Sequence, residues 1–123
     1  MFEVTKKAGF SAAHFLRDYD GPCSRLHGHN WTVEVVIRAP RVDKMGMVVD
    51  FVDLGRALDE LVESVDHRNL NKIPPFTEVN PTSENLAAWF HQELTRRLEP
   101  HGIAPHTVRI WELPDCSAAY WID

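Results

Sequence analysis

The chain has 123 residues, 44% of them hydrophobic, which predicts a single globular domain over residues 1–123. Its 13 basic and 18 acidic residues give a net charge of −5, which argues against a nucleic-acid-binding protein. No segment approaches the ~20 apolar residues of a membrane span, and the first residues lack the pattern of a secretory signal. We therefore expect a cytoplasmic protein with no membrane-bound segment, in which Cys23 and Cys116 are free thiols.

The predicted elements begin with an extended segment over residues 2–14 and a loop over 17–25 that is rich in turn-forming residues. The clearest strand covers residues 29–38, because apolar and β-branched side chains alternate along it. A short returning strand is predicted over residues 47–51. Strands are predicted again over residues 107–112 and 118–122, at the end of the chain.

Two amphipathic helices are predicted between these strands. Asp53 is a candidate cap for the first helix, and apolar residues recur at helical spacing from Leu54 to Val65. The second helix opens at Thr82–Glu84 with a candidate hydroxyl cap, and its apolar stripe ends at Leu98. The order β-β-α-α-β-β, with strands separated from a pair of helices, indicates an α+β fold with an antiparallel sheet.

Three histidines carry the main functional signal. His27 and His29 stand one residue apart where a strand begins, so their side chains point to one face. An antiparallel neighbour can bring His14 beside them. Three neutral imidazoles with one open position are the ligand set of a catalytic zinc site. The spacing alone also recurs by chance, which leaves open that each histidine is an ordinary core residue.

Cys23 lies on the polar loop, four residues before His27. Proximity to Zn²⁺ and Arg25 would favour its thiolate, which is the reactive form. The spacing leaves three interpretations open: a reactive thiol, a fourth ligand in a structural zinc site, or a small buried side chain. Cys116 lacks a comparable neighbourhood and is interpreted as structural.

Two acidic positions are further candidates. Asp66 can orient His67 for proton transfer, although a histidine there could simply interact with the end of the preceding helix. Glu112 alternates with apolar residues onto one strand face. It could accept two parallel N–H bonds from a heterocycle, or it could reach solvent at the strand end. The remaining histidines are expected to be solvated: His91, His101 and His106.

Six pieces of the chain, taken in order and spacing, resemble the 6-pyruvoyl-tetrahydropterin synthase superfamily over nearly the whole length. They are residues 10–14, 23–30, 46–51, 66–71 and 81–85 together with Glu112. Three residues between Cys23 and His27 resemble the 6-carboxytetrahydropterin synthase branch of queuosine (7-deazaguanine) biosynthesis. The pyruvoyl branch usually has a longer spacer there, and a related aldolase branch carries a glutamate in place of the cysteine.

The resemblance implies a role for nine residues. These are the ligands of one Zn²⁺ per subunit, His14, His27 and His29; the catalytic residues Cys23, Asp66 and His67; and the pterin-binding residues Glu112, Thr82 and Ser83. The implied architecture is the tunnelling fold, with a four-stranded antiparallel sheet and two helices packed on one face. Its units assemble through their sheets into a barrel-like homo-oligomer, a hexamer or tetramer, with active sites between subunits.

The reaction implied by the resemblance converts 7,8-dihydroneopterin triphosphate to 6-carboxy-5,6,7,8-tetrahydropterin and releases acetaldehyde and triphosphate. One alternative is a pyruvoyl-type triphosphate lyase that cleaves no carbon–carbon bond. A second is a non-catalytic binding module stabilised by zinc, with Cys23 as the fourth ligand.

A triphosphate requires cations, which this acidic chain offers near the motifs at Arg17, Arg25, Lys44 and Arg68.

Overall fold

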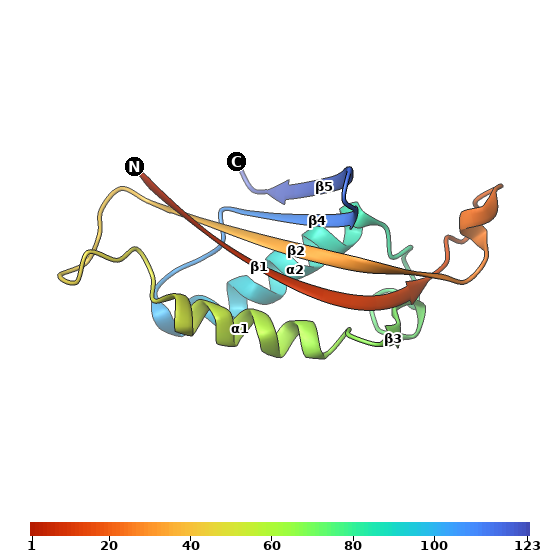
Figure 1. Ribbon diagram of the computed structural model, residues 1–123, viewed down its shortest axis with the longest axis horizontal. Coiled ribbons are helices and arrows are strands. Elements are labelled where there is room, and N and C mark those ends of the chain that lie inside the picture. The colour runs from red at the N-terminus through yellow and green to blue at the C-terminus, as the bar shows by residue number, and fades with distance from the viewer.

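A computed structural model describes all residues, 1–123, and shows a twisted sheet with both long helices on one of its faces (Figure 1). The long helices are α1 (Phe51–Glu63) and α2 (Ser83–Leu98). The strands are β1 (Phe2–His14), β2 (His27–Ala39), β3 (Arg68–Asn69), β4 (Thr107–Leu113) and β5 (Cys116–Trp121). Short 3-10 turns lie at Pro22–Ser24, Leu70–Lys72 and Glu99–His101.

The sheet has five strands in the order β3-β1-β2-β4-β5 and is mixed. The predicted α+β fold is confirmed, but the prediction of a four-stranded antiparallel sheet is wrong. The chain leaving α1 runs parallel to β1, with Ala12 opposite Arg68 and Ala13 opposite Asn69. This two-residue strand is too short for an alternating pattern, which explains why the sequence did not reveal it.

The β1–β2 hairpin determines where the histidines lie. The two strands pair antiparallel along their full length, from Phe2 opposite Ala39 to His14 opposite His27. Strand β2 therefore begins two residues earlier than the alternation predicted. The 3-10 turn Pro22–Ser24 lies in the connection that projects beyond the sheet at this end of the hairpin (Figure 1).

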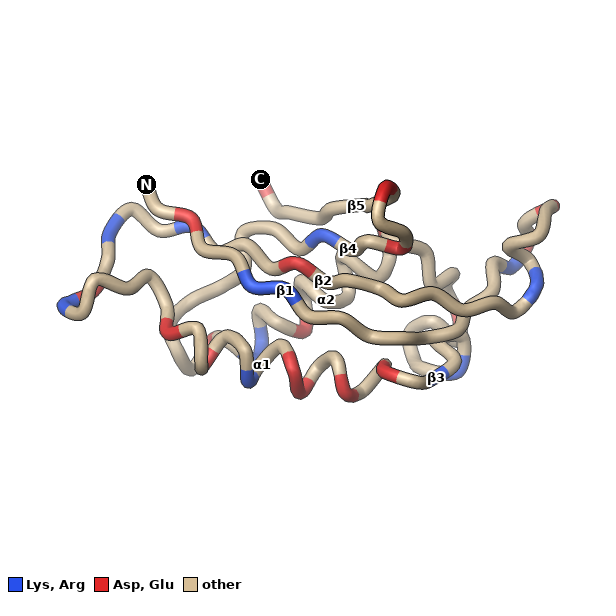
Figure 2. The backbone as a smooth tube through the Cα atoms, in the orientation of Figure 1, with Lys and Arg blue, Asp and Glu red and all other residues tan.

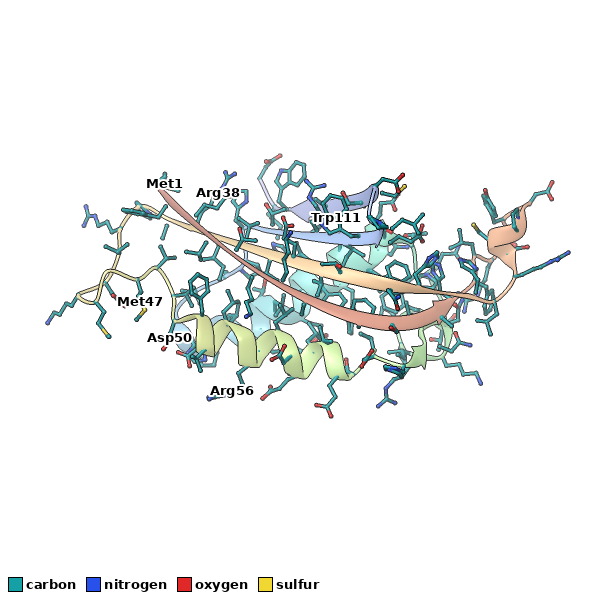
Figure 3. All side chains as sticks on the ribbon, in the orientation of Figure 1. Met1, Arg38, Met47, Asp50, Arg56 and Trp111 are labelled. Carbon is teal, nitrogen blue, oxygen red and sulfur yellow. The ribbon has the colours of Figure 1, made fainter.

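The predicted strand over residues 47–51 is wrong, because this segment leads directly into α1. Asp50 caps the helix: its Oδ1 accepts a hydrogen bond of 2.8 Å from the Val52 amide. Figure 3 labels Asp50 at the start of α1, with Met47 in the preceding loop. Asp53, the predicted cap, lies in the first helical turn instead. A side-chain cap has outweighed the strand preference of two adjacent valines.

The core contains 22 buried hydrophobic residues between the sheet and the helices. Phe10 stacks on Trp31 and Phe90, with ring centroids 5.9 and 5.7 Å apart, so aromatic contacts connect β1, β2 and α2. His91 was predicted to be solvated, but it is only 5% exposed and packs against Tyr120 of β5. Neither α1 nor α2 combines the length and apolarity that a membrane-crossing helix requires.

Candidate metal centre and active site

The hairpin brings three imidazoles together on the helix-facing side of the sheet. His27 lies directly opposite His14, and His29 lies two residues further along β2. The ring centroids are 4.6 to 5.2 Å apart, and one ligand atom from each residue lies within 4.8 Å of the others. The sequence predicted this grouping correctly, and the three side chains form a possible metal site.

Backbone carbonyls set the orientation of two of the rings. Nδ1 of His14 lies 2.7 Å from the Pro81 carbonyl oxygen, and Nδ1 of His27 lies 2.7 Å from that of Arg25. When each Nδ1–H donates to its carbonyl, Nε2 carries a lone pair, which is the arrangement of a metal-ligating histidine with a fixed tautomer.

The chemistry of the three donors fits a divalent metal ion. Nε2 of His14 and Nε2 of His29 are buried and have no hydrogen-bond partner. Burial, together with the neighbouring His27, lowers the pKa of both imidazoles and so favours the neutral form that binds metals. Neutral imidazole nitrogens in a group of three suit Zn²⁺.

Glu112 lies beside this cluster. Its Oε1 is 3.5 Å from Nε2 of His14 and 3.7 Å from Nε2 of His29, and about a third of its side chain is exposed (32%). The register of β4 with β5 shifts between Trp111 and Leu113, so Glu112 sits at a bulge. The carboxylate therefore lies beside the cluster and is partly exposed, and the alternative that it only reaches solvent does not fit these distances.

Cys23 lies in the 3-10 turn Pro22–Ser24 as a partly buried free thiol. Its carbonyl oxygen accepts a 2.9 Å hydrogen bond from the Leu16 amide, which connects the turn to the chain just after His14. The group of possible metal-ligating atoms comprises the three imidazoles without the Cys23 thiol. This grouping does not support Cys23 as a fourth ligand, and its action on a substrate stays a prediction.

Asp66 and His67 form a pair at the end of the sheet, with Oδ1 of Asp66 3.0 Å from Nδ1 of His67. The backbone N–H of Ser11 donates to the same carboxylate at 2.9 Å, and this bond, followed by the bond from His67, lowers the pKa of Asp66. His67 adopts the left-handed backbone conformation, with φ 58°, which is uncommon outside glycine and occurs at functional sites.

The Asp66–His67 pair makes no hydrogen bond or ion pair with the three histidines. His67 is exposed and lines a cleft of 540 Å³ together with Ser11, Asn30, Arg68 and one residue of the cluster, His29. The side chains of Ser11 and Asn30 point away from the helices, because their strand neighbours Ala12 and Trp31 are buried in the core. Within one chain, the pair therefore makes no direct bond to the three imidazoles, although its cleft borders on His29.

Thr82 and Ser83 begin α2. The Thr82 hydroxyl accepts a 3.1 Å hydrogen bond from the Asn85 amide, which confirms the predicted hydroxyl cap. Their contact with a pterin stays a prediction. The sequence did not reveal the role of the preceding residue, Pro81, whose carbonyl orients His14, because no side-chain pattern marks a backbone acceptor.

Basic segments lie at both ends of the molecule, in the loop between β2 and α1 as well as at the histidine end of the hairpin (Figure 2). Figure 2 shows basic segments in the connection between β1 and β2 and beside β3, whereas acidic residues follow α1. Arg17 of this connection points its guanidinium at the carbonyls of Val79 and Asn71, 3.3 and 3.5 Å away. Arg25 and Arg68 are exposed, and they remain the better candidates for contact with a phosphate.

The model of one family, described as 6-pyruvoyl tetrahydropterin synthase, matches residues 3–123. The chain belongs to this family. The structure of the Caenorhabditis elegans 6-pyruvoyl tetrahydropterin synthase superposes with a TM-score of 0.87 at 29% identity, over 99% of this chain and 96% of that one. The predicted family is thus confirmed, and with it the prediction of an enzyme.

Relatives with different names match over most of the chain. A 6-carboxy-5,6,7,8-tetrahydropterin synthase from Synechocystis is 35% identical over 98% of this chain and 94% of its own. A putative enzyme of the same name from Archaeoglobus fulgidus is 40% identical over 86% and 84%. A dihydroneopterin monophosphate aldolase from Pyrococcus furiosus is 37% identical over 89% and 88%. Identity alone therefore does not distinguish between these reactions.

Proposed function

We propose that the chain is a zinc-dependent 6-carboxy-5,6,7,8-tetrahydropterin synthase of cytoplasmic queuosine (7-deazaguanine) biosynthesis. It would convert 7,8-dihydroneopterin triphosphate and water to 6-carboxy-5,6,7,8-tetrahydropterin, acetaldehyde and triphosphate. The observation that carries this proposal is the cluster of His14, His27 and His29, with orphaned Nε2 atoms beside the Glu112 carboxylate. Cys23, where the aldolase branch has a glutamate, favours the synthase over the activity named for the Pyrococcus relative.

Each residue near the cluster has a chemical task in this proposal. A Zn²⁺ ion held by the three imidazoles would polarise the side-chain oxygens of the substrate and so make the adjacent C–H bonds more acidic. Glu112 accepts N–H bonds from the pterin ring and holds it at the open side of the cluster. The Cys23 thiolate removes a proton from the substrate side chain, which lies between the ring and the turn that carries Cys23.

The second proton-transfer pair is supplied by a neighbouring subunit. Support for this comes from the bonds of Asp66 and His67, which join the two residues to each other and to Ser11 but to none of the three histidines of their own chain. Both sheet edges are also open: β5 has no outer neighbour, and β3 covers only Ala12 and Ala13 of β1. Open edges pair readily with other strands, which favours a homo-oligomer joined through its sheets, a hexamer or a tetramer.

The test is product analysis with the purified, zinc-loaded protein and 7,8-dihydroneopterin triphosphate. The proposal requires acetaldehyde in equal amount to triphosphate and a carboxytetrahydropterin by mass spectrometry. Triphosphate release without acetaldehyde would identify the pyruvoyl-type lyase instead. Zinc binding without any turnover, together with loss of zinc in Cys23→Ala, would identify the binding module.

A further inference from the structure

The segment just after His14 is held in an unusual way. Residues 15–17 extend beyond the end of β1, and two asparagine side chains bond to their backbone. Asn71 accepts from the Phe15 amide at 2.9 Å and donates to the Phe15 carbonyl at 3.0 Å. Asn80 makes the same pair of bonds to Arg17, at 2.8 and 3.1 Å. We call Asn71 and Asn80 the asparagine clamp.

The asparagine clamp takes the place of a neighbouring strand. In an extended chain, the N–H and C=O groups of alternate residues point to the same side, so those of Phe15 and Arg17 both face the clamp. A carboxamide offers one acceptor and a donor group, as a peptide unit does. The intervening residue, Leu16, faces the opposite side and donates its N–H to the carbonyl of Cys23 at 2.9 Å.

The clamp residues are themselves fixed. Asn71 is only 6% exposed, and its backbone N–H donates to the Asn69 side chain at 3.0 Å. The Asn80 carbonyl accepts from the Asn85 side chain at 2.8 Å, at the first turn of α2. A rigid helix end and a buried loop thus support both carboxamides, and little freedom is left to the segment between them.

We propose that Asn71 and Asn80 are positioning residues for Cys23. Their carboxamides fix the backbone of Phe15 and Arg17, and the Leu16 amide between them bonds to the turn that carries the thiol. The inference rests on the proposed function in one respect, that Cys23 acts on the substrate. It assigns the clamp a role in the geometry of the reaction, in addition to any role in folding.

The test uses Asn80→Ala and the nearly isosteric Asn80→Asp, both with Cys116→Ser so that Cys23 is the only thiol. Asn80 is partly exposed, so these variants disturb the core less than a change at buried Asn71. The matched control is Gln92→Ala, which removes an exposed carboxamide on α2. The measurements are the rate of Cys23 alkylation by iodoacetamide, zinc content, and kcat and KM for 7,8-dihydroneopterin triphosphate.

We expect alkylation of Cys23 to be about tenfold faster in Asn80→Ala, which loses both hydrogen bonds to Arg17, and faster by a smaller factor in Asn80→Asp, which loses only the bond that the amide donates. We expect kcat to fall by about 10- to 100-fold with little change in KM or zinc content, since misplacing a reactive group costs rate more than binding. The control should match the parent protein in every measurement.

Alkylation and kcat equal to those of the control would overturn the inference. So would a fall in kcat that follows zinc loss while alkylation stays unchanged, because the clamp would then act through His14. If the parent protein releases no product, the proposed function fails, but the alkylation rates still show whether the clamp positions Cys23. The two failures are therefore distinguishable.

Discussion

Removal of the metal should destabilise the fold by an amount that the structure allows us to estimate. Without metal, two buried nitrogens, Nε2 of His14 and Nε2 of His29, lack a hydrogen-bond partner, because the Glu112 carboxylate lies 3.5 and 3.7 Å away. A buried polar group left unsatisfied costs about 1–3 kcal/mol, so the pair costs about 2–6 kcal/mol. Free Zn²⁺ at about 100 times its dissociation constant contributes ~2.7 kcal/mol by mass action, which lies within this range.

This free energy converts to a shift in the melting temperature. For a domain of this size, about 4 °C per kcal/mol gives a fall in Tm of about 10 °C after chelation. The assay is calorimetry of the zinc-loaded protein before and after dialysis against a chelator, with the zinc content measured in parallel. Restoring zinc should restore the Tm.

Two variants make the assay specific. His29→Gln should abolish zinc binding and the response of Tm to chelator. His91→Asn alters a histidine that is also buried and has its pKa lowered by burial, but lies outside the cluster, so this variant should keep its zinc. If the protein binds zinc but its Tm is the same with and without chelator, a metal does not stabilise the fold by satisfying Nε2 of His14 and His29, and the reasoning is refuted.

Other changes separate the roles of single residues. Cys23→Ala should keep its zinc and lose at least about 100-fold in kcat, as expected for loss of a general base; loss of zinc would contradict this. Glu112→Gln should weaken pterin binding about tenfold by calorimetric titration and spare zinc, because a charged acceptor is lost. Thr82→Ala should lower the free energy of unfolding by about 1 kcal/mol, because the hydroxyl that caps α2 is lost. Thr82→Ser keeps this hydroxyl and should stay close to the parent protein. Because folding lowers the pKa of Asp66, its ionised carboxylate stabilises the fold at pH above 3.8, the unfolded pKa, and this stabilisation is lost as pH falls through the folded pKa. In Asp66→Asn the free energy of unfolding should therefore fall less steeply with decreasing pH. An unchanged pH dependence would contradict the bonds assigned to Asp66.

Local patterns predicted the parts of the fold that repeat with a period. Alternation gave β2, helical spacing gave α1 and α2, and the short spacing of His27 and His29 indicated the imidazole cluster. The two failures have different causes, one a local helix cap and the other a tertiary contact. The Asp50 cap turned a β-branched segment into the entry to α1. His91 is buried because α2 packs across both β4 and β5, which widens the buried face beyond its apolar stripe.

The polar support of the site could not be predicted from sequence for a related reason. The His14 bond to Pro81 spans 67 residues, and the Asn80 bonds to Arg17 span 63. These residues form no local pattern, and in two of the three bonds the acceptor is a backbone carbonyl, whose chemistry is the same at every residue. Side-chain types can therefore suggest which groups act, but they do not show what holds those groups in place.

These long-range bonds couple the metal site to the thiol. Two consecutive residues, Asn80 and Pro81, contact the chain on both sides of Phe15: Pro81 orients His14, and Asn80 holds Arg17, from which the chain continues to Cys23. A displacement of this pair would move the imidazole and the turn with the thiol together. Because the helix cap at Thr82 follows directly, we infer that the N-terminus of α2 is the rigid element that fixes the imidazole cluster relative to the turn of Cys23.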